Sequence, residues 1–461
     1  MPSKMPYKHA TGDRAHTFHG VWKAKPAKEI RAHNKNVNKE MPLTRLLIAL
    51  AFWTFSVLPT AHAADPADPI IIGLSYPRSG HYREEGLAQM RASLQAVKEI
   101  NAKGGVLGRP LKLIDRDSAA RPERARRNVD SMVAEGAVML FGSVSSAEAV
   151  AAGEQAKQHD RLYFATIGYS NDVTIEKGHR HIFRESTSAT MTGRALGQYL
   201  TQHFPGKTYF YITADYSWGH TSEASLRLNT STQNTGKHPG VTIPFPTAKQ
   251  SDYSGALKQA QASDADMLVL VLYGHDLVRA MQIADSMGLN RKMQVVAPNL
   301  TQSVIEQTGP GIMVGVIGAE HWFWRVPELE NAKAGMDFVE NFNKEYGLLP
   351  PSAAASAYTV IHQWADAANR SGSLAAQPLI SALENHRYSL LKGPAQWRGF
   401  DHQNVQKVYV VRVNDRATVI KHPSKQDYFE ILHSLDGDQA AIGHDDWVKL
   451  RKAAGQPETL R

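Results

Sequence analysis

The chain has 461 residues, which is long enough for two or three domains with separate hydrophobic cores. Hydrophobic residues make up 42% of it and charged residues 21%, which is typical of a globular protein. It contains no cysteine. That absence excludes disulfides, thiolate metal sites, a cysteine nucleophile and lipidation of an N-terminal cysteine.

The formal net charge of +8 is concentrated at the N-terminus. Residues 1–40 contain nine Lys and Arg residues against three acidic residues, a net of +6, and Arg45 adds one more positive charge. The rest of the chain, from Ala64 onward, carries a net charge of only +1. A nearly neutral body gives no reason to expect a nucleic-acid-binding surface.

Residues 41–63 have the pattern of a secretory signal peptide. Arg45 is the basic n-region, the apolar run extends from Leu46 to Leu58, and Ala61-His62-Ala63 is a small-x-small cleavage site. The run is shorter than the roughly 20 residues that a membrane-spanning helix needs, although a buried helix is an alternative. We therefore expect an exported, soluble mature chain. Residues 1–40 are expected to be a non-native or disordered leader from an upstream start codon.

Strands and helices then alternate along the chain. Strands are predicted at 70–75, 111–115, 138–141 and 162–165, with helices at 84–103, from Pro122 onward, and at 147–159. Gly104 and Gly105 end the first helix, because glycine adopts the left-handed conformation of a C-cap without strain. This order predicts a parallel sheet with helices on both faces.

The same alternation begins again after Met191. Helices are predicted at 191–203, from about 217, at 251–261 and at 276–287, and strands at 208–213, 241–245, 267–272, 294–297 and 312–317. Two consecutive units predict the α/β class with two doubly wound parallel-sheet lobes. Ligands of such sheets bind beyond the carboxyl ends of the strands, so a cleft that closes by hinge motion is expected between the lobes.

Several segments resemble the branched-chain amino acid and amide (Leu/Ile/Val-binding) family of type I periplasmic binding proteins, which serve ABC importers. The resemblance covers about residues 70 to 415. It is carried by Pro77, Gly80 and Gly86, by EINAKGGVLGRPL (99–111), FGSVSS (141–146), the segment 167–174, ADYSWG (214–219), FPTAKQSDYSGAL (245–257) and GPAQWRGFDHQ (393–403).

The resemblance implies that the chain crosses three times between the lobes through a three-strand hinge. Lobe 1 would comprise 70–187 and 320–397, and lobe 2 would comprise 188–319 and 398–422. Residues 423–461 would form a C-terminal extension of unassigned role. The resemblance also implies that the protein captures a small solute in the periplasm for an ABC transporter permease, with no enzymatic activity and no cofactor.

The family places ligand-binding positions in lobe 1 on Ser146, with Ser145 beside it, and on Tyr169 after Gly168. Hydroxyls and N–H groups at a helix N-terminus suit an anionic or carbonyl oxygen. Either serine could equally serve only as the helix cap. Tyr169 stands where the family has a threonine, so this pocket differs from that of the amino acid binders.

In lobe 2 the family has an aromatic residue that stacks on the ligand, and Trp218 occupies that position, although a core tryptophan is the alternative. The loop after the strand 267–272 supplies Tyr273 and His275. Asn299 stands where the amino acid binders place a glutamate beside the ligand ammonium. His81 and Tyr82, with Arg78 and Arg83, lie either at the cleft mouth or on solvated surface.

Because Asn299 is neutral, a branched-chain amino acid is not the expected ligand. The sequence instead favours a small polar or aromatic organic solute, with a carboxylate or amide, stacked on Trp218 and Tyr169.

A ligand-sensing protein that works with a separate membrane receptor is the alternative function. No metal site is expected at His179 and His181, and the segment 321–324 (HWFW) lines the cleft or packs the hinge.

Overall fold

The computed structural model describes residues 68–461. The proposed leader (1–40) and signal peptide (41–63) lie outside this range. Among the residues that it describes, no helix is both long enough and apolar enough to cross a membrane.

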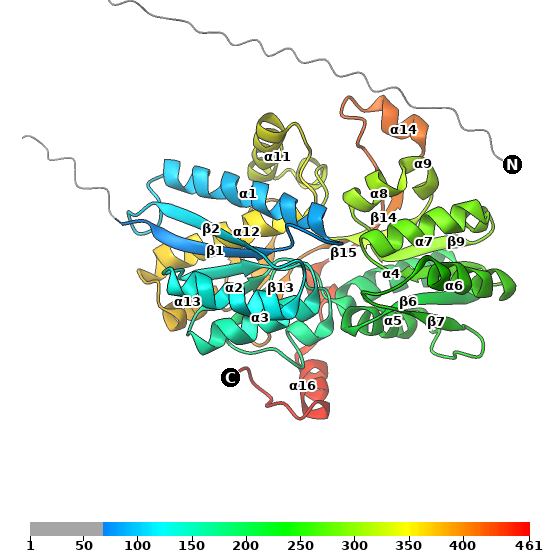
Figure 1. The fold of residues 1–461 in the computed structure, drawn as a ribbon, viewed down its shortest axis with the longest axis horizontal. Coiled ribbons are helices and arrows are strands. Elements are labelled where there is room, and N and C mark those ends of the chain that lie inside the picture. The colour runs from blue at the N-terminus through cyan, green and yellow to red at the C-terminus, as the bar shows by residue number, and fades with distance from the viewer. Residues whose placement is uncertain (1–67) are drawn as a thin grey trace, which may run out of the picture. The chain divides into compact units, whose positions relative to one another are not determined.

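The first sheet is entirely parallel, with the order β2-β1-β3-β4-β5. Its strands are β1 (Ile70–Tyr76), β2 (Leu111–Asp117), β3 (Met139–Gly142), β4 (Leu162–Ala165) and β5 (Ile182–Arg184). Figure 1 shows α1 (Arg83–Ala102) on one side of this sheet, with α2 (Pro122–Ala134) and α3 (Ser146–Gln158) on the other. Covered on both faces, β3 and β4 are wholly buried, which explains their continuous apolar sequences.

The second sheet has the order β15-β14-β10-β9-β8-β6-β7. Its parallel strands are β6 (Tyr209–Asp215), β7 (Gly240–Pro244), β8 (Met267–Val271), β9 (Gln294–Asn299) and β10 (Ile317–Glu320). The antiparallel strands β14 (Val408–Val413) and β15 (Phe429–Leu435) complete it. The helices of this lobe are α4 (Ala189–His203), α5 (Ser217–Thr230), α6 (Gln250–Ala262), α7 (His275–Ser286), α8 (Gln302–Thr308), α9 (Pro310–Met313) and α14 (Arg416–Lys421). The two parallel-sheet lobes confirm the predicted fold class.

The chain passes three times between the sheets. It leaves the first sheet after β5 to enter α4, and it returns after β10 to α10 (Val326–Leu329), α11 (Lys333–Tyr346), α12 (Ser352–Ser371) and α13 (Ala376–Leu383). Helix α12 packs along α1 of the first lobe. A three-stranded sheet follows, made of β11 (Arg387–Tyr388), β12 (Ala395–Trp397) and β13 (Asn404–Val405), and the chain then crosses to β14.

Buried polar side chains join these three crossings. Arg184 Nε donates to Gln403 Oε1 at 2.6 Å, and Gln403 Nε2 donates to the Ser186 carbonyl at 2.8 Å. Lys392 Nζ donates to the carbonyls of His321 and Lys407, the latter at 3.1 Å. Because buried polar groups need hydrogen-bond partners, these contacts fix the three segments side by side.

The predicted strand at 312–317 is wrong. Residues Pro310–Met313 form the short helix α9, and β10 begins only at Ile317. Proline is favourable at the first position of a helix, where its missing N–H has no partner to lose. Gly315 then turns the chain with a φ of +81°, which an apolar β-branched residue would not adopt.

The C-terminal segment contacts both lobes. Strand β15 pairs with β14 of the second sheet, and the chain continues through α15 (Gly437–Ala440) to α16 (His444–Ala453). Helix α16 lies on the first lobe, where Trp447 Nε1 donates to the Thr174 carbonyl at 2.9 Å and Arg451 Nη1 donates to the Gly178 carbonyl at 3.1 Å. The segment therefore ties one lobe to the other outside the hinge.

We predict that Trp447→Ala destabilises the fold by about 3 kcal/mol, because it removes a fully buried indole and its hydrogen bond. Chemical denaturation would measure this. Lys449→Ala, on the exposed side of the same helix, should leave the unfolding free energy unchanged. Equal stability of the Trp447 variant and the unmutated chain would show that α16 does not hold the first lobe.

Candidate functional site

The predicted ligand-binding residues come together where the carboxyl ends of the two parallel sheets face each other. From the first lobe come Tyr82 after β1, Ser145 and Ser146 after β3, and Gly168 and Tyr169 after β4. From the second lobe come Trp218 after β6, Tyr273 after β8 and Asn299 at the end of β9. Strand polarity therefore collects residues that are far apart in the sequence, as expected for parallel α/β sheets.

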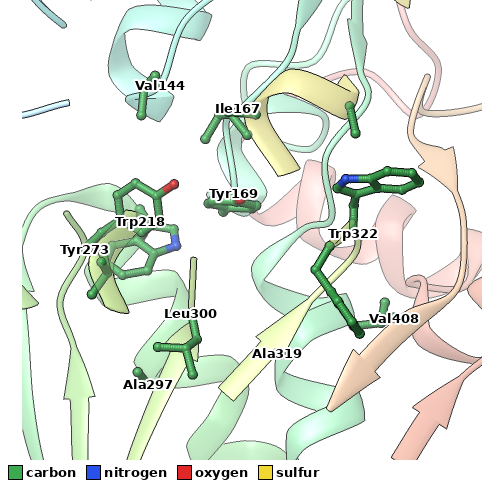
Figure 2. Close-up of a cluster of buried hydrophobic side chains, with 14 of the residues drawn as sticks. Val144, Ile167, Tyr169, Trp218, Tyr273, Ala297, Leu300, Ala319, Trp322 and Val408 are labelled. Atoms are coloured by element: carbon green, nitrogen blue, oxygen red, sulfur yellow. The ribbon is translucent and has the colours of Figure 1, made fainter. Parts of the chain in front are cut away.

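Four aromatic rings from both lobes form the centre of this region. The ring centroid of Tyr273 lies 5.7 Å from that of Tyr82, 5.9 Å from that of Tyr169 and 6.0 Å from that of Trp218, each at a steep interplanar angle. All four side chains are buried. Figure 2 shows Trp218 and Tyr273 together, with Tyr169 across from them. Such edge-to-face contacts between lobes indicate a closed cleft.

Gly274 allows the two lobes to approach each other at this point. Its φ is +57°, and a Cβ placed on it would lie 3.0 Å from two ring carbons of Tyr82. Both the backbone conformation and the space therefore require glycine. The loop after β8 can in this way contact the loop after β1 directly.

Hydroxyl groups add polar contacts across the cleft. Ser170 Oγ lies 2.7 Å from Ser217 Oγ, and Ser217 Oγ also donates to the Asp172 carboxylate. Ser303 Oγ of the second lobe donates to the buried carboxyl group of Glu85 in the first. These residues were not predicted, since short polar side chains carry no signal until the tertiary structure brings them together.

Trp218 and Asn299 bind each other within the second lobe. The indole Nε1 donates to Asn299 Oδ1 at 3.3 Å. Both side chains are buried, at 2% exposure each. The amide oxygen of Asn299 therefore holds the indole plane in a fixed orientation.

The two serines before α3 already have protein partners. Ser145 Oγ accepts from the Glu148 N–H at 3.3 Å as the N-cap, and Ser146 Oγ accepts from the Ser170 N–H at 3.0 Å. The Glu148 carboxyl accepts from the Val144 N–H at 3.1 Å. An acidic group of the protein itself thus occupies part of the helix N-terminus at which the resemblance implies a ligand oxygen.

The residues predicted at the mouth of the cleft, Arg78, His81, Tyr82 and Arg83, do not stay together, because Tyr82 is buried among the rings. His81 and His275 are exposed, one on each lobe, with ring centroids 5.9 Å apart. Burial, and then the neighbouring His81, lower the pKa of His275, which favours its neutral form. Arg78 and Arg83 instead pair on the surface with Asp115 at 3.5 Å and with Glu84 at 2.6 Å.

The segment 321–324 divides between the cleft and the core. Trp322 and Phe323 pack against Phe338 and Phe429, with ring centroids 6.0 and 5.3 Å apart. The imidazole of His321 instead lies 6.4 Å from the Tyr169 ring, and its Nε2 is 3.2 Å from Ser356 Oγ. His321 thus reaches the cleft while its neighbours fill the hinge.

Glu320 ends β10 and was missed by the sequence reasoning. The rule that ligands meet the carboxyl ends of strands identifies this position only when β10 is placed correctly, and the strand had been predicted to end at residue 317. Glu320 is 3% exposed. Burial raises the pKa of its carboxyl group well above the ordinary value, and the nearby Ser352 and Lys392 oppose this only in part.

Comparison with known proteins assigns the family. Residues 69–418 match the family model described as periplasmic binding protein, which covers most of the chain. The chain therefore belongs to the periplasmic binding protein family. Members of this family are solute-binding transport proteins rather than enzymes.

Individual relatives agree with this assignment. The chain is 25% identical over 396 residues to Leu/Ile/Val-binding protein homolog 4 of Brucella melitensis, covering 82% of this chain and 92% of the relative. A periplasmic binding protein from Burkholderia mallei has a TM-score of 0.73 at 23% identity, with 82% of this chain and 97% of the other covered. A solute-binding protein of an ABC transporter from Rhodopseudomonas palustris, in complex with 3,4-dihydroxy benzoic acid, has a TM-score of 0.69 at 19% identity, covering 80% and 98%. The two structural likenesses show the shared type I fold.

The buried carboxyl group of Glu148 should make the free energy of unfolding depend on pH. Burial raises the pKa of its carboxyl group from 4.5 to about 7. The folded protein therefore holds this proton more tightly than the unfolded chain does. The resulting stabilisation is complete below about pH 4.5 and is lost as the pH rises through 7.

Glu148→Gln keeps the hydrogen-bond acceptor and removes the titration. Between pH 5 and pH 8, the melting temperature of the unmutated protein should fall relative to that of this variant. Glu154→Gln, a partly exposed carboxylate on the same helix, should behave like the unmutated chain. If the unmutated protein and Glu148→Gln lose stability equally over this range, the assignment to Glu148 is incorrect.

Proposed function

We propose that this protein captures a small organic solute between its two lobes and delivers it to the permease of an ABC importer. The solute is an amino acid, an amide, or an aromatic or carboxylate compound. Export through residues 41–63 would bring the protein to the periplasm, where such capture takes place.

The buried ring cluster of Tyr82, Tyr169, Trp218 and Tyr273 carries this proposal. The rings come from both lobes and can share one buried space only when the lobes are closed. A solute that contacts both lobes binds the closed state more tightly than the open state. Its binding therefore shifts the population toward closure, which is the signal that a permease can read.

The relatives support a small organic compound as the ligand. The Brucella melitensis relative is named for leucine, isoleucine and valine, and the Rhodopseudomonas palustris structure contains 3,4-dihydroxy benzoic acid. In the present chain Asn299 is neutral and is engaged by the Trp218 indole. It thus supplies no negative charge for an ammonium group, so the ligand differs from that of the branched-chain amino acid binders.

Trp218→Ala should weaken solute binding by about 2 kcal/mol or more, since a buried tryptophan at the centre of an interface is typical of a binding hot spot. Calorimetric titration with amino acids, amides, amines and aromatic acids would identify a ligand and then measure the loss. Trp324→Ala removes an indole that bonds the Gln426 carbonyl, away from the ring cluster, and should leave the affinity unchanged. Tight binding of leucine or valine that is unaffected by Trp218→Ala would contradict the proposal.

A further inference from the structure

Buried polar atoms without partners gather beside the ring cluster. Tyr169 Oη, Tyr273 Oη, His321 Nδ1 and both carboxyl oxygens of Glu320 have no hydrogen-bond partner among the residues that the structure describes. The exposure of these four side chains is only 2–4%. Unsatisfied buried groups are costly and rare in folded proteins, so a group of them at one place indicates that something else supplies their partners.

These atoms belong to one site. The carboxyl group of Glu320 is close enough to raise the pKa of both tyrosine hydroxyls, although burial is the larger cause. Glu320 Oε2 also lies 3.7 Å from His321 Nδ1. Glu320 comes from the second sheet and Tyr169 from the first, so the unsatisfied atoms line both sides of the closed cleft.

Two buried carboxyl groups, those of Glu320 and Glu85, flank this site, and burial raises the pKa of both, so a cation beside them would favour their ionised form. Glu85 lies near Tyr273 and raises the pKa of its hydroxyl, as Glu320 does. The buried cations on this side of the hinge are already engaged. The Arg184 guanidinium donates to Gln403, Thr174 and the carbonyls of Gly168 and Ser170, and the Lys392 ammonium donates to two carbonyls. An anionic ligand group would therefore meet two carboxyl groups, while the side chains of both cations are held in hydrogen bonds to the protein.

The aromatic rings favour the opposite charge. Tyr82, Tyr169 and Trp218 each meet the Tyr273 ring edge to face, at interplanar angles of 60°, 65° and 67°. Ring faces attract cations, and several faces around a positively charged nitrogen make an aromatic cage. A carboxylate beside the cage adds a charge-assisted hydrogen bond to any N–H of that nitrogen.

We propose that the solute carries a protonated amine that lies among these rings and pairs with the carboxylate of Glu320, and that it needs no carboxylate of its own. This proposal deepens the proposed function and rests on it. The ligand class is a small organic amine. The tyrosine hydroxyls accept from its remaining N–H groups. The α3 N-terminus, where Glu148 and both serines are engaged, contributes no carboxylate subsite.

Two matched sets of compounds test the amine directly. Leucine, isoamylamine and isocaproate share one carbon skeleton, and phenylalanine, phenethylamine and phenylpropanoate share another. Titration calorimetry should show at least tenfold tighter binding of one amine than of its parent amino acid and of its deaminated acid. Glu320→Gln should weaken that amine at least tenfold. Glu84→Gln, a partly exposed carboxylate that pairs with Arg83, should change the affinity less than twofold.

A second variant covers the case in which Glu320→Gln does not fold. Trp218→Leu keeps an apolar side chain but removes the ring face, and it too should weaken the amine at least tenfold. If the acids or amino acids bind and the amines do not, this inference is overturned while the proposed function stands. If Glu320→Gln folds and binds the amine unchanged, the pairing with Glu320 is overturned. If none of the six compounds binds, and no other amino acid, amide or aromatic acid does, both proposals fail together.

Discussion

The structure depends on one constraint, which is that the carboxyl ends of two parallel sheets face each other. Each sheet contributes its ligand loops at that edge, so residues from seven strand ends occupy one buried region. Tyr273 is the clearest example, because its ring contacts Tyr82 and Tyr169 of the first lobe and Trp218 of its own lobe. None of these contacts between lobes survives if the lobes separate.

The hinge has to permit that separation while keeping the lobes in register. Its three crossings are joined by buried polar contacts of Arg184, Gln403 and Lys392 rather than by apolar packing alone. Hydrogen bonds between adjacent segments are directional and short in range, so they hold the segments side by side while small dihedral changes rotate the lobes. Burial lowers the pKa of Lys392 to about 7, although Glu185, Glu330 and Glu320 nearby act to raise it.

The sequence predicted the fold class because apolar runs such as 267–272, placed between helical segments, are read correctly without tertiary information. The run at 312–317 was misread, since a short apolar segment fits either a helix or a strand until Pro310 and Gly315 are weighed. That error concealed Glu320. The resemblance directed attention to Trp218 and Tyr273, and the local sequence allowed Ser145 to be a helix cap, as it is. The Trp218–Asn299 bond could not be predicted, because it depends on a distance between two segments that only the folded chain sets.

The central claim is that a solute binds among the rings between the lobes. A crystal structure of the protein with a ligand identified by titration tests it most directly. The account predicts ligand density in contact with Tyr169, Trp218 and Tyr273, with the lobes closed around it. Density in the pocket of about 290 Å³ that Lys392, Lys407 and Asp436 line, with the ring cluster unchanged, would contradict it.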